Sequence, residues 1–301
     1  MSEGRGSTKG RLIAAITGSF AVTSDFHLDL NYDNYCVIGN PVAHSKSPRI
    51  HQAFAEQTNQ NIHYQAILVP ADGLIPFLQK FQQQGGKGLN ITLPFKEVAY
   101  QAMHVKTART SRTGSVNTVW FAADGSRYGD TTDGRGLVRD LLNCNIDPQG
   151  KHILILGAGG AVRGVLPDLF ETGPATITIS NRTCARAEQL RRHFSEYQNL
   201  YVLPVEELQG SRFDIVINGT SASLKGEMLP LPDDILAPGA SCYDMAYGDK
   251  ETVFIRWGQQ HGAAIAVDGL GMLVEQAAEA FAIWRGIRPA TPPVIAMLRK
   301  K

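Results

Sequence analysis

The sequence of 301 residues predicts an α/β fold with two domains that face each other across a cleft. At about 150 residues per domain, the length corresponds to two units. Short apolar segments alternate with segments of helical period along most of the chain, as in mainly parallel sheets covered by helices. A glycine-rich turn at residues 157–161 follows a continuous apolar strand and opens a helix. This strand–turn–helix order is typical of a Rossmann domain.

Composition excludes several classes of protein. Hydrophobic residues make up 43% and charged residues 19%, with a net charge of +1, which excludes an intrinsically disordered chain. The near-neutral charge gives no support to binding of nucleic acid or of an anionic membrane. No apolar run is long enough to span a bilayer. The four cysteines form no CxxC pair and no zinc pattern, so we expect no metal and a reduced, cytoplasmic protein.

The first half is expected to begin at residue 34, after a poorly ordered extension at residues 1–33. Ser47 is expected to cap the first helix, with Pro48 at its first position. The turn signal Asp124-Gly125 predicts a hairpin. The expected strands are 35–38, 64–69, 88–93, 117–122 and 126–129, and the expected helices are 48–58, 73–84 and 96–104.

The second half reads as alternating strands and helices of a Rossmann-type domain. The expected strands are 151–156, 175–180, 201–203, 213–218 and 240–244, with helices after residue 160 and at 185–194. A helix at 134–143 joins the halves. An amphipathic helix at 272–284 follows all these strands and is free to pack on the first half. We therefore expect a discontinuous domain of residues 34–134 plus 269–301, and a Rossmann domain of residues 135–268.

The glycine-rich turn predicts a dinucleotide site. Backbone N–H groups of Gly157, Ala158, Gly159, Gly160 and Ala161 lie at a helix N-terminus, where they favour a phosphate. The GxGxxG pattern is incomplete because residue 162 is Val, so a plain βα turn is the alternative.

The residues after the second strand of this half indicate which dinucleotide binds. An NAD enzyme would place Asp or Glu there, whereas this chain has Asn181, Arg182, Thr183 and then Arg186. Arginine suits the 2′-phosphate of NADP and is unfavourable at a helix start without an anion. The sequence thus favours NADP over NAD, and two solvated arginines are the alternative.

Polar residues at strand ends of the first half indicate a catalytic site. Ser45 and Ser47, in a segment expected to be extended, can present both hydroxyls to one side. Thr92 and Lys96 follow another strand. Asp133 near Lys96 would form a pair suited to moving a proton to or from a hydroxyl. The alternatives are capping serines and carboxylates, and a solvated lysine.

From residue 35 to the C-terminus, the chain resembles the shikimate dehydrogenase family. Six segments carry the resemblance: GNPVAHSKSP (39–48), NITLPFKE (90–97), GSVNT (114–118), TTDG (131–134), DMAY (244–247) and DGLGMLVEQ (268–276). Three positions depart from the usual pattern: Thr131 stands in place of Asn, and Ser115 and Gly219 stand in place of Ala.

The resemblance implies roles for the residues in these segments. Ser45 and Ser47 would bind the substrate carboxylate, while Lys96 and Asp133 would be catalytic. The other implied substrate ligands are Thr92, Asn117, Asp133, Tyr247 and Gln276, and Met245 and Gly269 would lie at the cofactor. The implied reaction is reduction of the C3 carbonyl of 3-dehydroshikimate by NADPH, giving shikimate in the pathway to chorismate and the aromatic amino acids.

Three other functions remain as alternatives at this point. They are a quinate/shikimate dehydrogenase with relaxed substrate or NAD use, a folate-linked methylene dehydrogenase, and a non-catalytic NADP-binding sensor. The expected partners are small molecules, with no nucleic acid and no membrane. Oligomeric state is left open, with a homodimer as one alternative.

Overall fold

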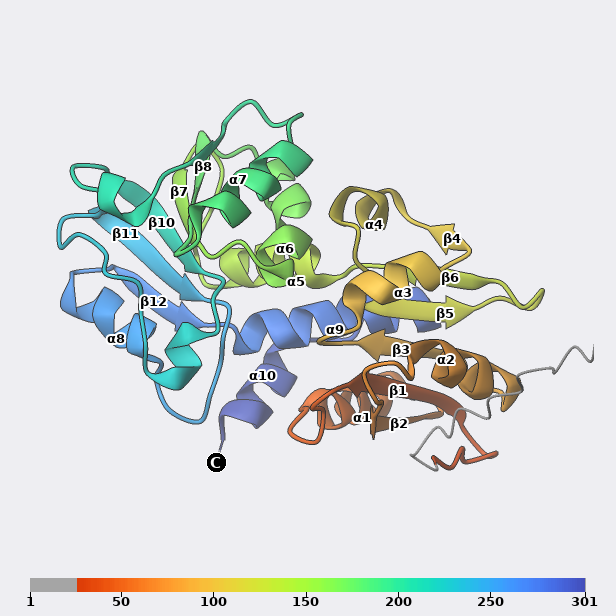
Figure 1. Cartoon of the computed structure of the whole chain (residues 1–301). Coiled ribbons are helices and arrows are strands. Elements are labelled where there is room, and N and C mark those ends of the chain that lie inside the picture. Colours follow the sequence, from red (N-terminus) through yellow and green to blue (C-terminus); the bar gives the residue numbers. More distant parts are fainter. Residues whose placement is uncertain (1–25, 301) are drawn as a thin grey trace, which may run out of the picture.

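The computed structural model describes residues 26–300, which contain two six-stranded sheets (Figure 1). The first sheet has the order β2-β1-β3-β5-β6-β4. Its strands are β1 (Asp33–Gly39), β2 (Ile62–Leu68), β3 (Gly88–Ile91), β4 (Val105–Lys106), β5 (Thr118–Phe121) and β6 (Arg127–Asp130). Strands β1, β2 and β3 are parallel, while β5 is antiparallel to both β3 and β6. The predicted parallel strands and the predicted hairpin are confirmed.

Four helices belong to this half of the chain: α1 (Ser47–Thr58), α2 (Leu74–Gln83), α3 (Lys96–Ala102) and α4 (Ala108–Thr113). Helix α2 buries Phe77 and Phe81 against Leu89 of the sheet. The sequence did not predict β4 and α4, because ARTSRT in α4 has no apolar period.

The second sheet has the order β12-β11-β10-β7-β8-β9 with parallel pairing throughout the described residues. Its strands are β7 (His152–Leu156), β8 (Thr176–Ser180), β9 (Leu200–Val202), β10 (Phe213–Asn218), β11 (Leu236–Asp244) and β12 (Ile265–Asp268). Counted within this half, the order is 3-2-1-4-5-6, which is the doubly wound Rossmann order. The predicted Rossmann fold is confirmed, although β12 was not predicted.

The helices of this half are α6 (Gly160–Glu171), α7 (Cys184–His193) and α8 (Val253–Gln260), with short 3₁₀ turns η1 (Val205–Glu207) and η2 (Ala222–Lys225). Helix α8 was not predicted. Buried Phe254 and Ile255 of α8 pack with Leu154 and Val216 of the central strands. The helices thus cover a sheet whose central strands are apolar on both faces.

Helices α5 (Asp133–Asn143) and α9 (Leu270–Arg285) lie between the two sheets, followed by α10 (Pro292–Arg299) (Figure 1). They approach closely because residue 136 is glycine: a Cβ there would lie 2.7 Å from the Cβ of Gln276. Further along, Phe281 of α9 is buried with Ile50 and Phe54 of α1. The C-terminal helix therefore returns to the first half of the chain, as the sequence indicated.

The expected poorly ordered extension does not hold for residues 26–33. Phe26 is buried, and its ring lies 5.2 Å from that of Phe77 and 5.6 Å from that of Phe81. Burial of an aromatic ring offsets the entropy cost of ordering this segment. Residues 1–25 of the expected extension lie outside the described residues. Within residues 26–300, no helix is both long and apolar enough to cross a bilayer.

Candidate active site

A cavity of about 390 Å³ lies where the first sheet, the loop after β11 and helix α9 meet. The predicted catalytic and substrate-binding residues all line it: Ser45, Ser47, Thr92, Lys96, Asn117, Asp133, Tyr247 and Gln276. Met245 and Gly269, predicted at the cofactor, line the same cavity. Segments more than 200 residues apart in the sequence thus contribute to one site.

Strand direction explains this convergence. Strands β1 and β3 are parallel, so the Ser45 loop and Thr92 both follow strand ends at one edge of the sheet. Strand β5 runs antiparallel to β3, so Asn117 precedes its start at that same edge. Strand β6 reverses again and delivers Asp133 there. Ligands of open α/β sheets bind at such an edge.

The predicted lysine–carboxylate pair is formed in the structure. The Nζ atom of Lys96 donates to Oδ2 of Asp133 at 2.5 Å, and both side chains are partly buried. Nδ2 of Asn117 donates to Oδ1 of Asp133 at 2.8 Å. Each carboxylate oxygen therefore has a donor, which leaves further N–H groups on Nζ for a substrate oxygen.

A second set of contacts connects this pair to α9. Nδ2 of Asn117 lies 3.0 Å from Oγ1 of Thr132 and 3.4 Å from Oε1 of Gln276. The side chain of Gln276 is itself held through Nε2, which donates to the carbonyl of Leu273 at 2.8 Å. The sequence interpretation did not include Thr132, although it stands inside the TTDG segment.

Asn90 is a second residue that the sequence interpretation missed. It lines the cavity, accepts from the Tyr64 hydroxyl at 2.8 Å and donates to the Asn117 carbonyl at 3.1 Å. The signal was its spacing: Asn90 lies two residues before Thr92, and a period of two places both on one face of an extended segment.

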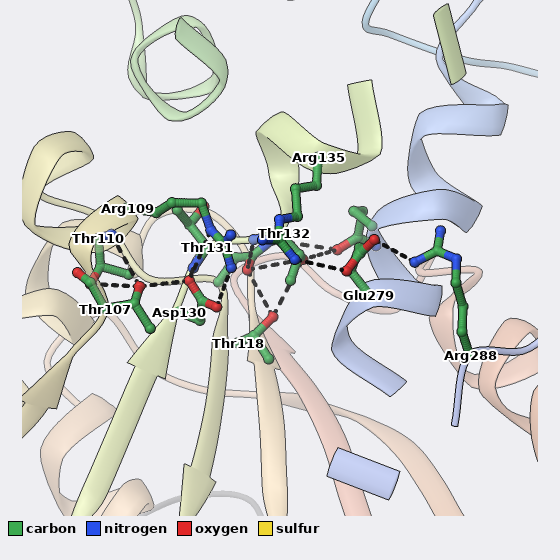
Figure 2. Close-up of polar contacts among 12 residues, drawn as sticks. Thr107, Arg109, Thr110, Thr118, Asp130, Thr131, Thr132, Arg135, Glu279 and Arg288 are labelled. Atoms are coloured by element: carbon green, nitrogen blue, oxygen red, sulfur yellow. Dashed lines mark hydrogen bonds and ion pairs between the residues drawn. The ribbon is translucent and has the colours of Figure 1, made fainter. Parts of the chain in front are cut away.

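A polar network behind the cavity fixes the loop that carries Asp133 (Figure 2). The buried carboxylate of Asp130 accepts from Arg109 at 2.6 Å, from Thr107 at 2.7 Å and from the Thr131 backbone at 2.8 Å. Charge-assisted bonds of this kind are among the stronger ones in proteins. The end of β6 is therefore anchored to α4 before the chain enters the site.

The serine loop differs from its prediction. The segment makes a turn instead of being extended, because the Ser45 backbone donates to the Val42 carbonyl at 3.0 Å. Helix α1 begins at Ser47, which makes no capping bond, so its expected capping role is wrong. Ser45 Oγ instead accepts from the Ser47 backbone at 3.3 Å. Pro48 in the first turn permits this earlier start.

The far wall of the cavity comes from the end of β11 and the start of α9. Burial raises the pKa of the Tyr247 hydroxyl, so this phenol stays protonated and is able to donate. At residue 269 a Cβ would clash with the Met245 backbone, so glycine is required for this close approach.

The glycine-rich turn has the geometry expected of a phosphate site. Gly157 has φ +107° and ends β7, and α6 begins at Gly160. A Cβ built on Gly159 or Gly160 would meet nothing within 4 Å, so open space lies in front of this helix N-terminus. That space and the donors beside it fit the pyrophosphate of a dinucleotide.

The residues after β8 also fit the predicted ligand. Asn181 Nδ2 donates to the Thr183 carbonyl at 2.9 Å, which shapes the turn into α7. Arg182 and Arg186 are exposed, and within residues 26–300 neither guanidinium has a hydrogen bond or ion pair with another side chain. Two unpaired guanidiniums at a helix start suit an anionic group. No group of three or more His, Cys, Asp or Glu in the described part of the chain could hold a metal ion.

Comparison with known proteins decides the family. Three family models match: the shikimate dehydrogenase substrate-binding domain (residues 37–119), shikimate/quinate 5-dehydrogenase (140–225) and the shikimate 5′-dehydrogenase C-terminal domain (269–299). The shikimate dehydrogenase (NADP(+)) of Alkalilimnicola ehrlichii is 57% identical over 268 residues, covering 89% of this chain and 98% of that relative. The chain belongs to the shikimate dehydrogenase family.

Solved structures agree with this assignment. The Ael1 enzyme from Pseudomonas putida is 42% identical, with a TM-score of 0.83, over 89% of this chain and 99% of that one. Shikimate 5-dehydrogenase from Thermus thermophilus, solved with NADP(H) and shikimate, is 30% identical with a TM-score of 0.80, over 89% and 98% of the two chains. As a shikimate dehydrogenase, the protein is an NADP-dependent oxidoreductase that interconverts 3-dehydroshikimate and shikimate. The alternatives considered from the sequence are not favoured by these relatives.

Proposed function

We propose that the cavity around Lys96 and Asp133 is where this chain binds and reduces 3-dehydroshikimate. The observation that carries the proposal is the 2.5 Å contact between Lys96 Nζ and Asp133 Oδ2, with Asn117 on the other carboxylate oxygen. A general acid must lie within hydrogen-bond reach of the atom that it protonates and must itself be oriented. The Lys96–Asp133–Asn117 contacts supply that orientation.

The proposed chemistry divides between cofactor and protein. When bound, NADPH supplies the hydride. Lys96 Nζ donates a proton to the C3 oxygen as it acquires negative charge, and Asp133 Oδ2 retains its hydrogen bond to Nζ and keeps the ammonium in place. In the reverse direction, the same atoms accept the proton of the substrate hydroxyl.

The remaining cavity residues bind and orient the ring of the substrate. Ser45 and Ser47 take the carboxylate, since their hydroxyls lie beside the N-terminus of α1, which favours an anion. The other proposed substrate ligands are Thr92, Asn117, Tyr247 and Gln276. Their placement on several elements fixes the orientation that intramolecular-like reaction rates require.

The dinucleotide is proposed to bind along the carboxyl edge of the second sheet. The turn Gly157–Ala161 holds the pyrophosphate, while Met245 and Gly269 contact the nicotinamide end. Asn181, Arg182, Thr183 and Arg186 hold the 2′-phosphate. The complex of the Thermus thermophilus relative with NADP(H) and shikimate supports binding of both ligands by this fold.

The proposed division into domains follows the two sheets. Residues 34–134 plus 269–301 form the substrate domain, and residues 135–268 form the NADP domain. The burial of Phe281 with Ile50 and Phe54 supports the assignment of α9 to the first of these.

Location and assembly belong to the same proposal. The cysteine spacing supports a cytoplasmic protein. A homodimer is supported by the exposed apolar residues Leu30, Tyr32 and Leu68 beside edge strand β2. A mass measured by light scattering tests it, and the mass of one chain would exclude it.

Replacement of Lys96 tests the catalytic proposal. For Lys96→Ala we expect kcat to fall by roughly 10²–10⁴, since one general acid–base group is removed, with little change in the KM for shikimate. The matched control is Lys87→Ala, whose side chain is exposed on the opposite end of β3. Steady-state kinetics with shikimate and quinate, each with NADP and NAD, provides the readout. Near wild-type turnover in Lys96→Ala would remove Lys96 from catalysis.

A further inference from the structure

Arg163 connects the two sheets at a point outside the cavity. It lies in α6, two residues after the glycine-rich turn. Its Nε donates to the Thr113 carbonyl, and its Nη2 donates to the Gly114 carbonyl at 3.0 Å. Its Nη1 lies 3.4 Å from Oε1 of Glu97. The whole guanidinium is therefore engaged by residues of the first half of the chain.

The ends of two helices explain why arginine is stable here. A cation near the N-terminus of α6 is unfavourable in the field of that helix. The carbonyls of Thr113 and Gly114 lie at the C-terminus of α4, where the field has the opposite sign and the carbonyls lack helical partners. The planar guanidinium spans two such carbonyls at once, which an ammonium does less well.

Gly114 is adapted to the same contact. It ends α4 with φ +60°, a conformation that favours glycine. A Cβ at this position would lie 2.5 Å from Nη2 of Arg163. A side chain at residue 114 would thus displace the guanidinium from the carbonyls that it now contacts.

The segment held by Arg163 leads directly to the catalytic pair. Two residues after Gly114, the Val116 backbone donates to the Lys96 carbonyl at 2.9 Å. The next residue, Asn117, holds Asp133. Glu97, the third contact of Arg163, follows Lys96 in the chain. Arg163 therefore contacts both segments that place Lys96 and Asp133.

We propose that Arg163 is a positioning residue that couples dinucleotide binding at the N-terminus of α6 to substrate binding at Lys96 and Asp133. A dinucleotide that orders the start of α6 also orders segment 113–117 through Arg163, so that NADPH and shikimate bind with positive cooperativity. Thermodynamic linkage makes this effect equal in both directions. The inference rests on the proposed ligand sites described above.

The test measures binding of shikimate with and without NADPH, a pair that does not react. Isothermal titration gives the dissociation constant of each ligand alone and of shikimate with saturating NADPH. We expect shikimate to bind at least about fivefold tighter with NADPH in the wild-type protein. In Arg163→Met this ratio should fall below about twofold while each ligand alone binds within about threefold of wild type. The kcat should fall more than the KM for shikimate changes.

A matched control separates this contact from general loss of charge. Arg112 also connects α4 to α6, through Glu171 at 3.2 Å, but both side chains are exposed. Such a pair contributes little, so Arg112→Met should keep the wild-type ratio. An equal loss of the ratio in both variants would overturn the proposal.

Further variants close the remaining outcomes. Gly114→Ala perturbs the same contact from the other side and should lower the ratio without a further drop when combined with Arg163→Met. A melting curve establishes that each variant is folded. If Arg163→Met instead weakens NADPH binding alone tenfold and keeps the ratio, Arg163 is a cofactor ligand and the proposal is wrong. These measurements use binding only, so a failure of the catalytic roles, detected as turnover in Lys96→Ala, is seen separately.

Discussion

The substrate cavity and the dinucleotide end differ in how their polar side chains are satisfied. In the cavity, Lys96, Asp133, Asn117 and Gln276 are bonded to one another before any ligand is considered. At the dinucleotide end, exposed Arg182 extends into solvent with no side-chain partner among residues 26–300.

The difference follows from burial. Unpaired polar groups are costly in a buried site, so the cavity must satisfy its own donors and acceptors. Exposed guanidiniums are solvated and can wait for a phosphate without such a cost. The cavity is therefore organised for chemistry by the protein alone, whereas the dinucleotide end is completed by its ligand.

The largest expected effect breaks the cavity network at its centre. Asp133→Asn keeps the size of the side chain but gives Lys96 no carboxylate to orient it. We expect kcat to fall by roughly 10²–10⁴, as for loss of a positioned acid–base group. Steady-state kinetics and its pH profile measure this. A variant with wild-type kcat would show that the Lys96–Asp133 contact is structural only.

A smaller effect is expected at the dinucleotide end. Replacing Arg182 and Arg186 by alanine should raise the KM for NADP by roughly 10–100-fold, since each charge-assisted bond contributes about 1.5–3 kcal/mol before solvent screening. The KM for NAD should change little. Replacing Arg191 and Arg192, exposed in the last turn of the same helix, is the control. Equal effects on NADP and NAD would rule out a contact with the 2′-phosphate.

The serine loop should give an effect on binding more than on turnover. For Ser45→Ala and Ser47→Ala separately, we expect the KM for shikimate to rise by roughly tenfold, as one hydrogen bond to a carboxylate is lost. Ser195→Ala, exposed and distant in sequence from the loop, is the control. An unchanged KM in both variants would place the substrate carboxylate elsewhere.

The smallest effect concerns a buried carboxylate that lacks the partners of Asp133. Asp168 Oδ2 is buried without a hydrogen bond, and burial raises the pKa of this carboxyl to about 6. The folded state thus binds a proton between about pH 4 and 6 that the unfolded state has lost. The free energy of unfolding should therefore fall as pH rises through this range and stay low above it.

Asp168→Asn should remove this dependence. We expect the variant to be about 1–2 kcal/mol more stable than wild type at pH 8 and to lose that advantage towards pH 4. Urea unfolding across this range measures it, with Glu171→Gln, exposed on the same helix, as control. A parallel pH dependence in Asp168→Asn and wild type would contradict the assignment.

Much of the fold could be predicted because apolar periods are local signals. The parallel strands, the hairpin and the return of α9 follow from alternation, turn residues and an amphipathic pattern. Helix α10 was missed because it begins with Pro292 and Pro293, which also terminate structure. The packing of Phe26 was missed because it depends on Phe77 and Phe81, some fifty residues away.

The site shows the same limit at the level of side chains. Motifs identified Lys96 and Asp133, whose pairing the structure contains. They did not identify Arg163, because its partners are backbone carbonyls and carry no sequence signal. The capping role expected for Ser47 was wrong since helix starts shift by a residue with little change in energy.

Helix α9 also determines when each half of the protein can finish folding during synthesis. Ile50 and Phe54 emerge from the ribosome early, but Phe281, which covers them, emerges more than 200 residues later. At about 5–20 residues per second, the first half waits at least ten seconds for its last helix. The Rossmann half, interposed in the sequence, has all its strands before then. The half that is made first is therefore completed last, and its apolar groove stays open to chaperones in the interval.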